Sequence, residues 1–257
     1  MRVPSLKFFV PILLLGLLLG ASSTACADTI VVTSITLSNF QFTPASGTAT
    51  FTPTAASSRA RPLNSLGESQ DITSNTFPVA QSTASVTFAN ANATGNATNG
   101  TATAITSVSV GNCTCNAAAF AQATFTGTLV ITGGQGPVDV IFSFVPAAMG
   151  QATTDQFGVF AEASATYLVL LNGVAIFSQD ELLNGVNGPN QTAGFALIPH
   201  EMSHSFTLQF GAVNTIEVRV NSNSIGANSV PEPATIVLLI SGLGVMSGLL
   251  KKRRTGP

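Results

Sequence analysis

The chain has 257 residues and a formal charge of −2 at pH 7, and only 8% of its residues are charged. Residues 28–229, termed the body, hold ten acidic residues and three arginines, so the body carries a formal charge of −7. Without a basic cluster it cannot neutralise phosphates, which argues against nucleic acid as a partner. Its length suits one domain with its own core.

The first 27 residues have the composition of an export signal. Two basic residues precede the apolar run 8–19, and Ala25 and Ala27 form an A-x-A cleavage site. This order is typical of a secretory signal peptide, so we expect Sec export and removal of residues 1–27 by cleavage after Ala27. A lipoprotein signal cut before Cys26 is the alternative, but a serine stands where such signals carry leucine.

Hydrophobic residues recur at every second position through most of the body, which indicates β-strands. In the first half, strands are predicted at 29–37, 48–52, 84–89 and 102–110. The weakly patterned stretch 54–75, which holds Arg59 and Arg61, is expected to be a mobile loop. The Asn- and Gly-rich stretch 90–100 is also expected to be turn or loop.

Three hairpins are predicted in the second half of the body. They pair 125–131 with 138–145, the strand ending at Leu171 with 174–177, and 206–210 with 216–220. The Asn172-Gly173 turn is the strongest of these signals, because both residues accept a positive φ. Residues 167–171 are apolar on both faces, which indicates a central strand.

One short helix is predicted at 178–185. Ser178 and Glu181 have the spacing of a capping box, and Gly185 would end the helix. A calcium site that uses Asp180 and Glu181 is the alternative, since Ca²⁺ prefers carboxylate oxygens.

Roughly ten short strands without a long helix predict an all-β fold, an antiparallel β-sandwich that is jelly-roll-like or immunoglobulin-like. Ala161, Ala163 and Ala165 lie on one face of a strand, which implies that the opposing sheet approaches closely or fills the space with phenylalanine. The chain has no Trp, so a sugar-stacking surface would depend on Tyr167 or Phe.

Cys113 and Cys115 remain after the predicted cleavage. An oxidising compartment permits a disulfide, but a Cys-x-Cys bridge is strained. Both a Cys113–Cys115 disulfide and two free thiols are therefore compatible with the sequence. A metal–thiolate site would need a second pair of ligands, which the body does not offer.

Residues 200–204 fit the zinc-protease pattern H-E-x-x-H, with His200 and His204 as ligands and Glu201 activating a bound water. The pattern needs a helix, however, and the residues from Ser205 onward alternate as a strand. A turn before a strand is therefore the preferred interpretation. No other catalytic or cofactor motif is found in the body, so we expect neither an enzyme nor a cofactor; zinc retained after purification would favour a hydrolase instead.

Residues 230–257 combine three features in order. The motif Val230, Pro231, Glu232, Pro233, Ala234 and Thr235 is followed by an uncharged run, 234–250, and by the basic residues Lys251, Lys252, Arg253 and Arg254. As a helix the run would span roughly 25 Å, enough for a short transmembrane segment. The positive-inside tendency would keep the basic residues in the cytoplasm and leave the body outside.

This order resembles the PEP-CTERM sorting signal of exported bacterial proteins. The resemblance implies that an exosortase cuts near Pro-Glu-Pro and that the body moves from the membrane to the cell surface or its matrix. It also implies a structural or adhesive role among extracellular polysaccharides. A carbohydrate-binding module is the first alternative, and a metal-dependent hydrolase that uses residues 200–204 is the less favoured one.

Overall fold

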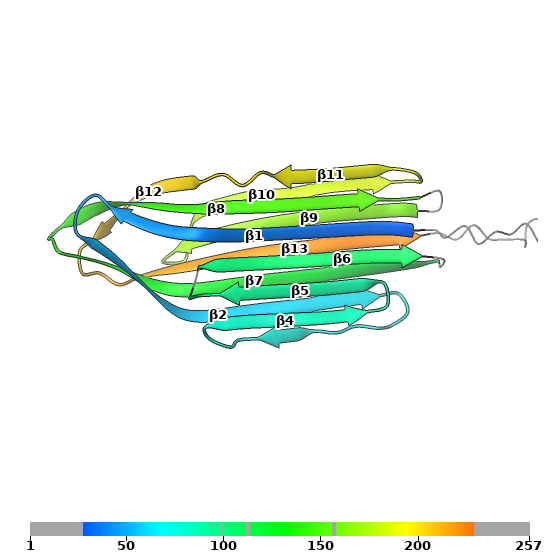
Figure 1. Ribbon diagram of the computed structural model, residues 1–257, viewed down its shortest axis with the longest axis horizontal. Coiled ribbons are helices and arrows are strands. Elements are labelled where there is room, and N and C mark those ends of the chain that lie inside the picture. The colour runs from blue at the N-terminus through cyan, green and yellow to red at the C-terminus, as the bar shows by residue number, and fades with distance from the viewer. Residues whose placement is uncertain (1–27, 99, 112–113, 156–157, 229–257) are drawn as a thin grey trace, which may run out of the picture.

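The computed structural model describes residues 28–98, 100–111, 114–155 and 158–228, so the predicted signal peptide and sorting signal lie outside the described residues (Figure 1). The described part is all-β, as predicted, with antiparallel strand pairing throughout. It contains no helix of the length and hydrophobicity needed to cross a membrane.

Two sheets stack face to face, and their strands run along the long axis of the molecule (Figure 1). Sheet A has the order β11-β8-β1-β6-β5-β4, and β12 pairs with β8 on the same side as β11. Its strands are β1 (Asp28–Pro44), β4 (Val79–Val86), β5 (Ala89–Asn96), β6 (Thr101–Gly111), β8 (Pro137–Thr153), β11 (Thr192–Leu197) and β12 (Met202–Gln209).

Sheet B has the order β10-β9-β13-β7-β2-β3. Its strands are β2 (Thr48–Asn64), β3 (Ile72–Ser74), β7 (Cys115–Thr132), β9 (Gly158–Leu171), β10 (Val174–Asn187) and β13 (Asn214–Asn228). Several strands are much longer than predicted. A strand of 17 residues, such as β2, extends for roughly 55 Å.

One predicted hairpin is confirmed and two are wrong. Asn172 and Gly173 have φ values of 52° and 80° and join β9 to β10, which are paired in sheet B. The link 133–136 instead carries the chain from β7 in sheet B to β8 in sheet A, and 210–213 carries it from β12 back to β13. A glycine-containing turn between alternating segments has the same local pattern whether it joins neighbours in one sheet or crosses between sheets.

The predicted loops at 54–75 and 90–100 are largely wrong. β2 continues to Asn64 and β5 occupies 89–96, both with small inward residues such as Ala60 and Ala93 that give only a weak hydrophobic signal. The predicted strand 84–89 spans the turn between β4 and β5, and the predicted helix at 178–185 is part of β10. The central strand predicted at 167–171 is confirmed, since β9 lies between β10 and β13.

The core changes character along the strands. Near one end, phenylalanine rings from both sheets pack together: Phe40 and Phe125 meet edge to face with ring centroids 4.9 Å apart, and Phe142 and Phe144 stack at 5.5 Å. Towards the other end the buried positions are mostly alanine, as at Ala104, and the sheets face each other over small side chains.

Where the core is thin, hydroxyl groups of one sheet reach the other. Thr33 Oγ1 on β1 donates to the backbone oxygen of Asn223 on β13 at 3.0 Å, and Ser222 Oγ on β13 donates to the oxygen of Thr33 at 3.1 Å. Thr106 Oγ1 on β6 lies 2.8 Å from the hydroxyls of both Ser222 and Ser224. These contacts satisfy buried polar groups that would otherwise destabilise the core.

The start of β1 and the end of β13 are tied together at this thin end (Figure 1). Thr29 Oγ1 donates a hydrogen bond to Asn228 Oδ1, and Asn228 Nδ2 donates to the backbone oxygen of Val110 at 2.5 Å. Thr29 and Asn228 are both buried. The body therefore begins and ends at the same end of the sandwich.

Gly95 on β5 tests how closely the sheets approach. A Cβ at this position would lie 2.5 Å from the backbone oxygen of Thr124 and 2.8 Å from that of Ser57, both in sheet B. We expect Gly95→Ala to lower the free energy of unfolding by about 1–3 kcal/mol, because backbone has to move to admit the methyl group. Thr94→Ala, on the outer face of the same strand, should change it by less than about 0.5 kcal/mol. Equal midpoints in chemical denaturation would contradict the close approach.

Candidate functional site

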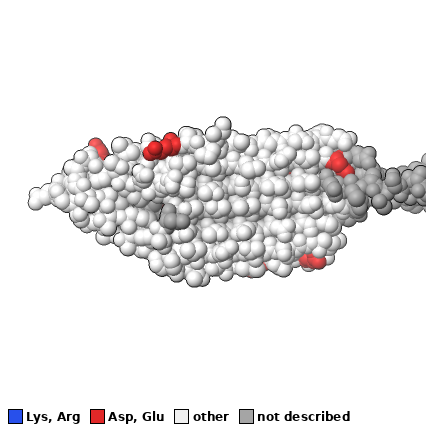
Figure 2. Space-filling model, in the orientation of Figure 1, with Lys and Arg blue, Asp and Glu red and all other residues white. Residues whose placement is uncertain are grey.

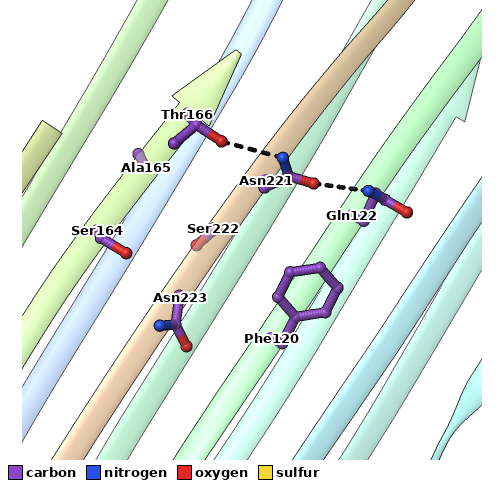
Figure 3. A pocket seen from close by; sticks show the side chains of 8 residues that line it. All are labelled: Phe120, Gln122, Ser164, Ala165, Thr166, Asn221, Ser222 and Asn223. Atoms are coloured by element: carbon purple, nitrogen blue, oxygen red, sulfur yellow. Dashed lines mark hydrogen bonds between the residues drawn. The ribbon is translucent and has the colours of Figure 1, made fainter. Parts of the chain in front are cut away.

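A row of polar side chains crosses three strands on the outer face of sheet B (Figure 3). Asn221 on β13 is in register with Thr166 on β9 and with Gln122 on β7. Asn221 Nδ2 donates to Thr166 Oγ1 at 3.0 Å, and Gln122 Nε2 donates to Asn221 Oδ1 at 2.8 Å. Each amide nitrogen has a second N–H, so the row keeps donors and acceptors for a ligand.

An aromatic ring lies beside this row. Phe120 is in register with Asn223, one step along β7 and β13 from Gln122 and Asn221, and its ring is half-exposed (Figure 3). A shallow depression of about 380 Å³ covers both the row of Thr166, Asn221 and Gln122 and the neighbouring pair Phe120 and Asn223. It is lined by Phe120, Gln122, Ser164, Ala165, Thr166, Asn221, Ser222 and Asn223.

A second depression of about 330 Å³ continues the first towards β2. It shares Phe120 and Asn223 with the first and adds Arg59 and Arg61. Arg59 forms a two-point ion pair with Asp71, with Nε–Oδ1 and NH2–Oδ2 distances of 2.8 and 2.5 Å. The hydrogen bonds of this pair lower the pKa of Asp71 and raise the pKa of Arg59.

The residues predicted as a zinc site lie elsewhere and not on a helix. His200 and Glu201 are in the short link between β11 and β12, next to Pro199, and His204 is on β12. His200 Nδ1 is 2.9 Å from the backbone oxygen of Ile198, and the ring of His204 packs against Phe177 at 5.4 Å. Within the described ranges, no three His, Cys, Asp or Glu side chains are grouped so that they could hold a metal ion.

Tyr167 is not available for stacking. It is 2% exposed, its hydroxyl donates to Met202 Sδ at 3.2 Å, and burial raises its pKa. Phe120 is instead the aromatic ring on the outer face of sheet B, termed the candidate face. The predicted strand begins only at residue 125, so Phe120 and Gln122 were missed as candidate residues. The register of β7 with β13, and of β13 with β9, shows what lies beside them.

Parts of the predicted cysteine pair and of the alternative calcium site lie among the described residues. Cys115 is disulfide-bonded, and Cys113 lies outside the described residues. The side chains of Asp180 and Glu181, considered for calcium, are also outside the described set, although their backbone belongs to β10.

Comparison with known proteins identifies the C-terminal segment. Residues 229–254 match the model of the PEP-CTERM protein-sorting motif. The chain carries a PEP-CTERM sorting signal. The match includes Val230–Thr235 and Lys251–Arg254 and confirms the resemblance noted in the sequence. PEP-CTERM motifs indicate export and sorting at the membrane, and they imply processing by an exosortase. No curated protein and no solved structure matches the chain.

The ion pair at the edge of the candidate face should be visible in an acid titration. Because the folded-state pKa of Asp71 is lowered, the stabilisation from the pair is complete above the ordinary aspartate pKa and is lost as pH falls through the lowered value. We expect NMR of the Asp71 carboxyl group to show a depressed midpoint that rises towards the ordinary value in Arg59→Gln, because the hydrogen bond from Arg59 is the largest cause of the lowered pKa. An unchanged midpoint in that variant would show that Arg59 does not cause the shift.

Proposed function

We propose that this chain is an exported, non-enzymatic protein of the cell surface or extracellular matrix, and that its body binds polysaccharide through the outer face of sheet B. In this proposal the signal peptide 1–27 is removed, residues 234–250 anchor the chain in the membrane as a helix, and an exosortase cuts near the Val230–Thr235 motif. The body then acts as a structural or adhesive component of an exopolysaccharide matrix.

The observation that carries the binding proposal is the row of Thr166, Asn221 and Gln122, termed the amide row, beside the half-exposed ring of Phe120. Thr166, Asn221 and Gln122 present neutral donors and acceptors on a rigid sheet, and Phe120 presents an apolar surface beside them. Sugars have the matching chemistry, with hydroxyl groups around the ring edge and C–H groups on the ring faces. Adjacent strands lie about 4.8 Å apart, so a row over three strands spans roughly 10 Å, enough for a short stretch of a polysaccharide chain.

Binding without turnover is supported by the kind of residue in the first depression. None of the side chains that line it is a carboxylate or a histidine. Glycoside hydrolysis usually requires two carboxyl groups on either side of the scissile bond. The lining suits holding a sugar chain and offers no general acid for cleaving one.

Substitutions on the two faces of the sandwich test the proposed surface. We expect Phe120→Ala to weaken binding to the host's purified extracellular polysaccharide about two- to twelvefold, in line with roughly 0.5–1.5 kcal/mol for a lost ring contact. Ile105→Ala, on the outer face of sheet A, serves as the matched control and should leave the affinity unchanged. Affinity electrophoresis measures both variants. Equal losses, or no loss for Phe120→Ala, would count against the outer face of sheet B.

Processing is tested by the intact mass of the protein from its native host, with cell-bound and released fractions measured separately. We expect a released species that starts at Asp28 and ends within or close to Val230–Pro233. A released species that still carries Lys251–Pro257 would contradict exosortase sorting, because the membrane segment would then have been retained.

A further inference from the structure

All three arginines of the body lie on the outer face of sheet B. Arg59 and Arg61 alternate with buried residues on β2, and Arg219 does so on β13. The opposite side of the molecule, over β8, β1 and β6, shows no Lys or Arg (Figure 2). The body has a formal charge of −7, and its three arginines lie on the same face as the amide row.

Two of these arginines are already neutralised. Arg59 is held by Asp71, and Arg219 NH2 lies 2.5 Å from Glu217 Oε1. Among the described residues, Arg61 is the arginine without an ion pair, and its side chain is exposed. Its charge contributes to the lowered pKa of Asp71 without a direct contact. Its guanidinium group keeps donors for an anion, which it binds best in the two-point geometry that carboxylates offer.

Arg61 is placed next to the ring of the candidate face. It is in register with Phe120, and Phe120 is in register with Asn223, so cation, ring and amide follow one another across β2, β7 and β13. The two depressions meet at Phe120 and Asn223. A sugar chain that lies over Phe120 would thus bring its substituents to Arg61 at one end and to the amide row at the other.

We infer that the polysaccharide bound on this face is anionic, with a carboxylate on its sugar repeat that pairs with Arg61. This inference rests on the proposed function and adds the class of ligand. Phe120 and Asn223 hold the ring that carries the carboxylate, and Asn221 and Gln122 hold its neighbour.

The net charge of the body does not attract an anionic polysaccharide, so the attraction has to be local to Arg61. A body of −7 repels a polyanion at long range, and salt at physiological strength screens that repulsion beyond about 8 Å. Attraction must therefore come from a specific contact. Removing Arg61 and removing Arg219 change the net charge equally, so only a specific contact distinguishes the two variants.

The experiment uses the full-length chain in mild detergent and the host's purified extracellular polysaccharide, native and after chemical reduction of its carboxyl groups to alcohols. We expect the protein to bind the native polymer about tenfold more tightly than the reduced polymer, as for one charge-assisted hydrogen-bonded pair. Arg61→Gln should lose this preference and bind both polymers alike. Arg219→Gln should stay within about twofold of the unsubstituted protein, as expected for a rim charge.

Three outcomes would overturn the inference, and they differ in what they leave standing. Equal affinity of the unsubstituted protein for both polymers removes the anionic ligand but keeps polysaccharide binding. Equal losses in Arg61→Gln and Arg219→Gln reduce the effect to net charge. Failure to bind either polymer overturns the proposed function as well. The melting temperature of each variant checks its folding, which an exposed side chain such as Arg61 should not affect.

Discussion

The short distance between the two sheets is the constraint on which the rest of the body depends. Through the alanine-lined part of the core, hydroxyl groups of Thr33, Ser222 and Thr106 hydrogen-bond across the interface, and Gly95 lies against the backbone of the facing sheet. Larger inward side chains would push the sheets apart and leave these hydroxyls without partners. No buried side-chain nitrogen or oxygen lacks a hydrogen bond among the described residues, so the small residues and the polar contacts support each other.

This constraint also fixes what the outside of the molecule presents. A slip of one residue would turn every outward side chain inward, so a core that accepts only small groups on one side specifies the register strongly. The row formed by Thr166, Asn221 and Gln122 is a product of that register, because the three residues come from separate strands. The phenylalanine cluster around Phe142 fills the space at the other end of the sandwich, where the buried side chains are larger.

The sequence predicted strands best where β-branched and other large apolar residues mark the segment. Residues 29–37 and 102–110 alternate, residues 167–171 are apolar on both faces, and the structure has strands at all three places. β2 beyond residue 54 and β5 were missed because their inward residues are mainly small, such as Ala56, Ser58 and Ala91, and such residues become informative only when a facing sheet is known to be close. Which sheet a strand joins is likewise non-local, and for this reason two predicted hairpins proved to be crossings between sheets.

The candidate site was less predictable than the sorting motif. The motif is a linear pattern and could be read directly, whereas the binding face needs residues 122, 166 and 221 in one register. Tyr167 and Phe120 look equally suited to stacking in the sequence. Only the pairing of β9 shows that Tyr167 points into the core.

The hydrogen bond between Thr29 and Asn228 joins the start of β1 to the end of β13, so the two ends of the sandwich differ. The start of β1 and the end of β13 lie at the same end of the sandwich (Figure 1), and the phenylalanine cluster of Phe40, Phe42 and Phe142 lies towards the opposite end. If the body is attached at the end where β1 starts and β13 ends, its strands run away from the point of attachment along the long axis of the sandwich. The outer faces of both sheets would then be accessible from the side over most of the roughly 55 Å length of the longer strands. A cut after β13 would change where the body is attached and would leave the hydrogen bonds of the sandwich intact.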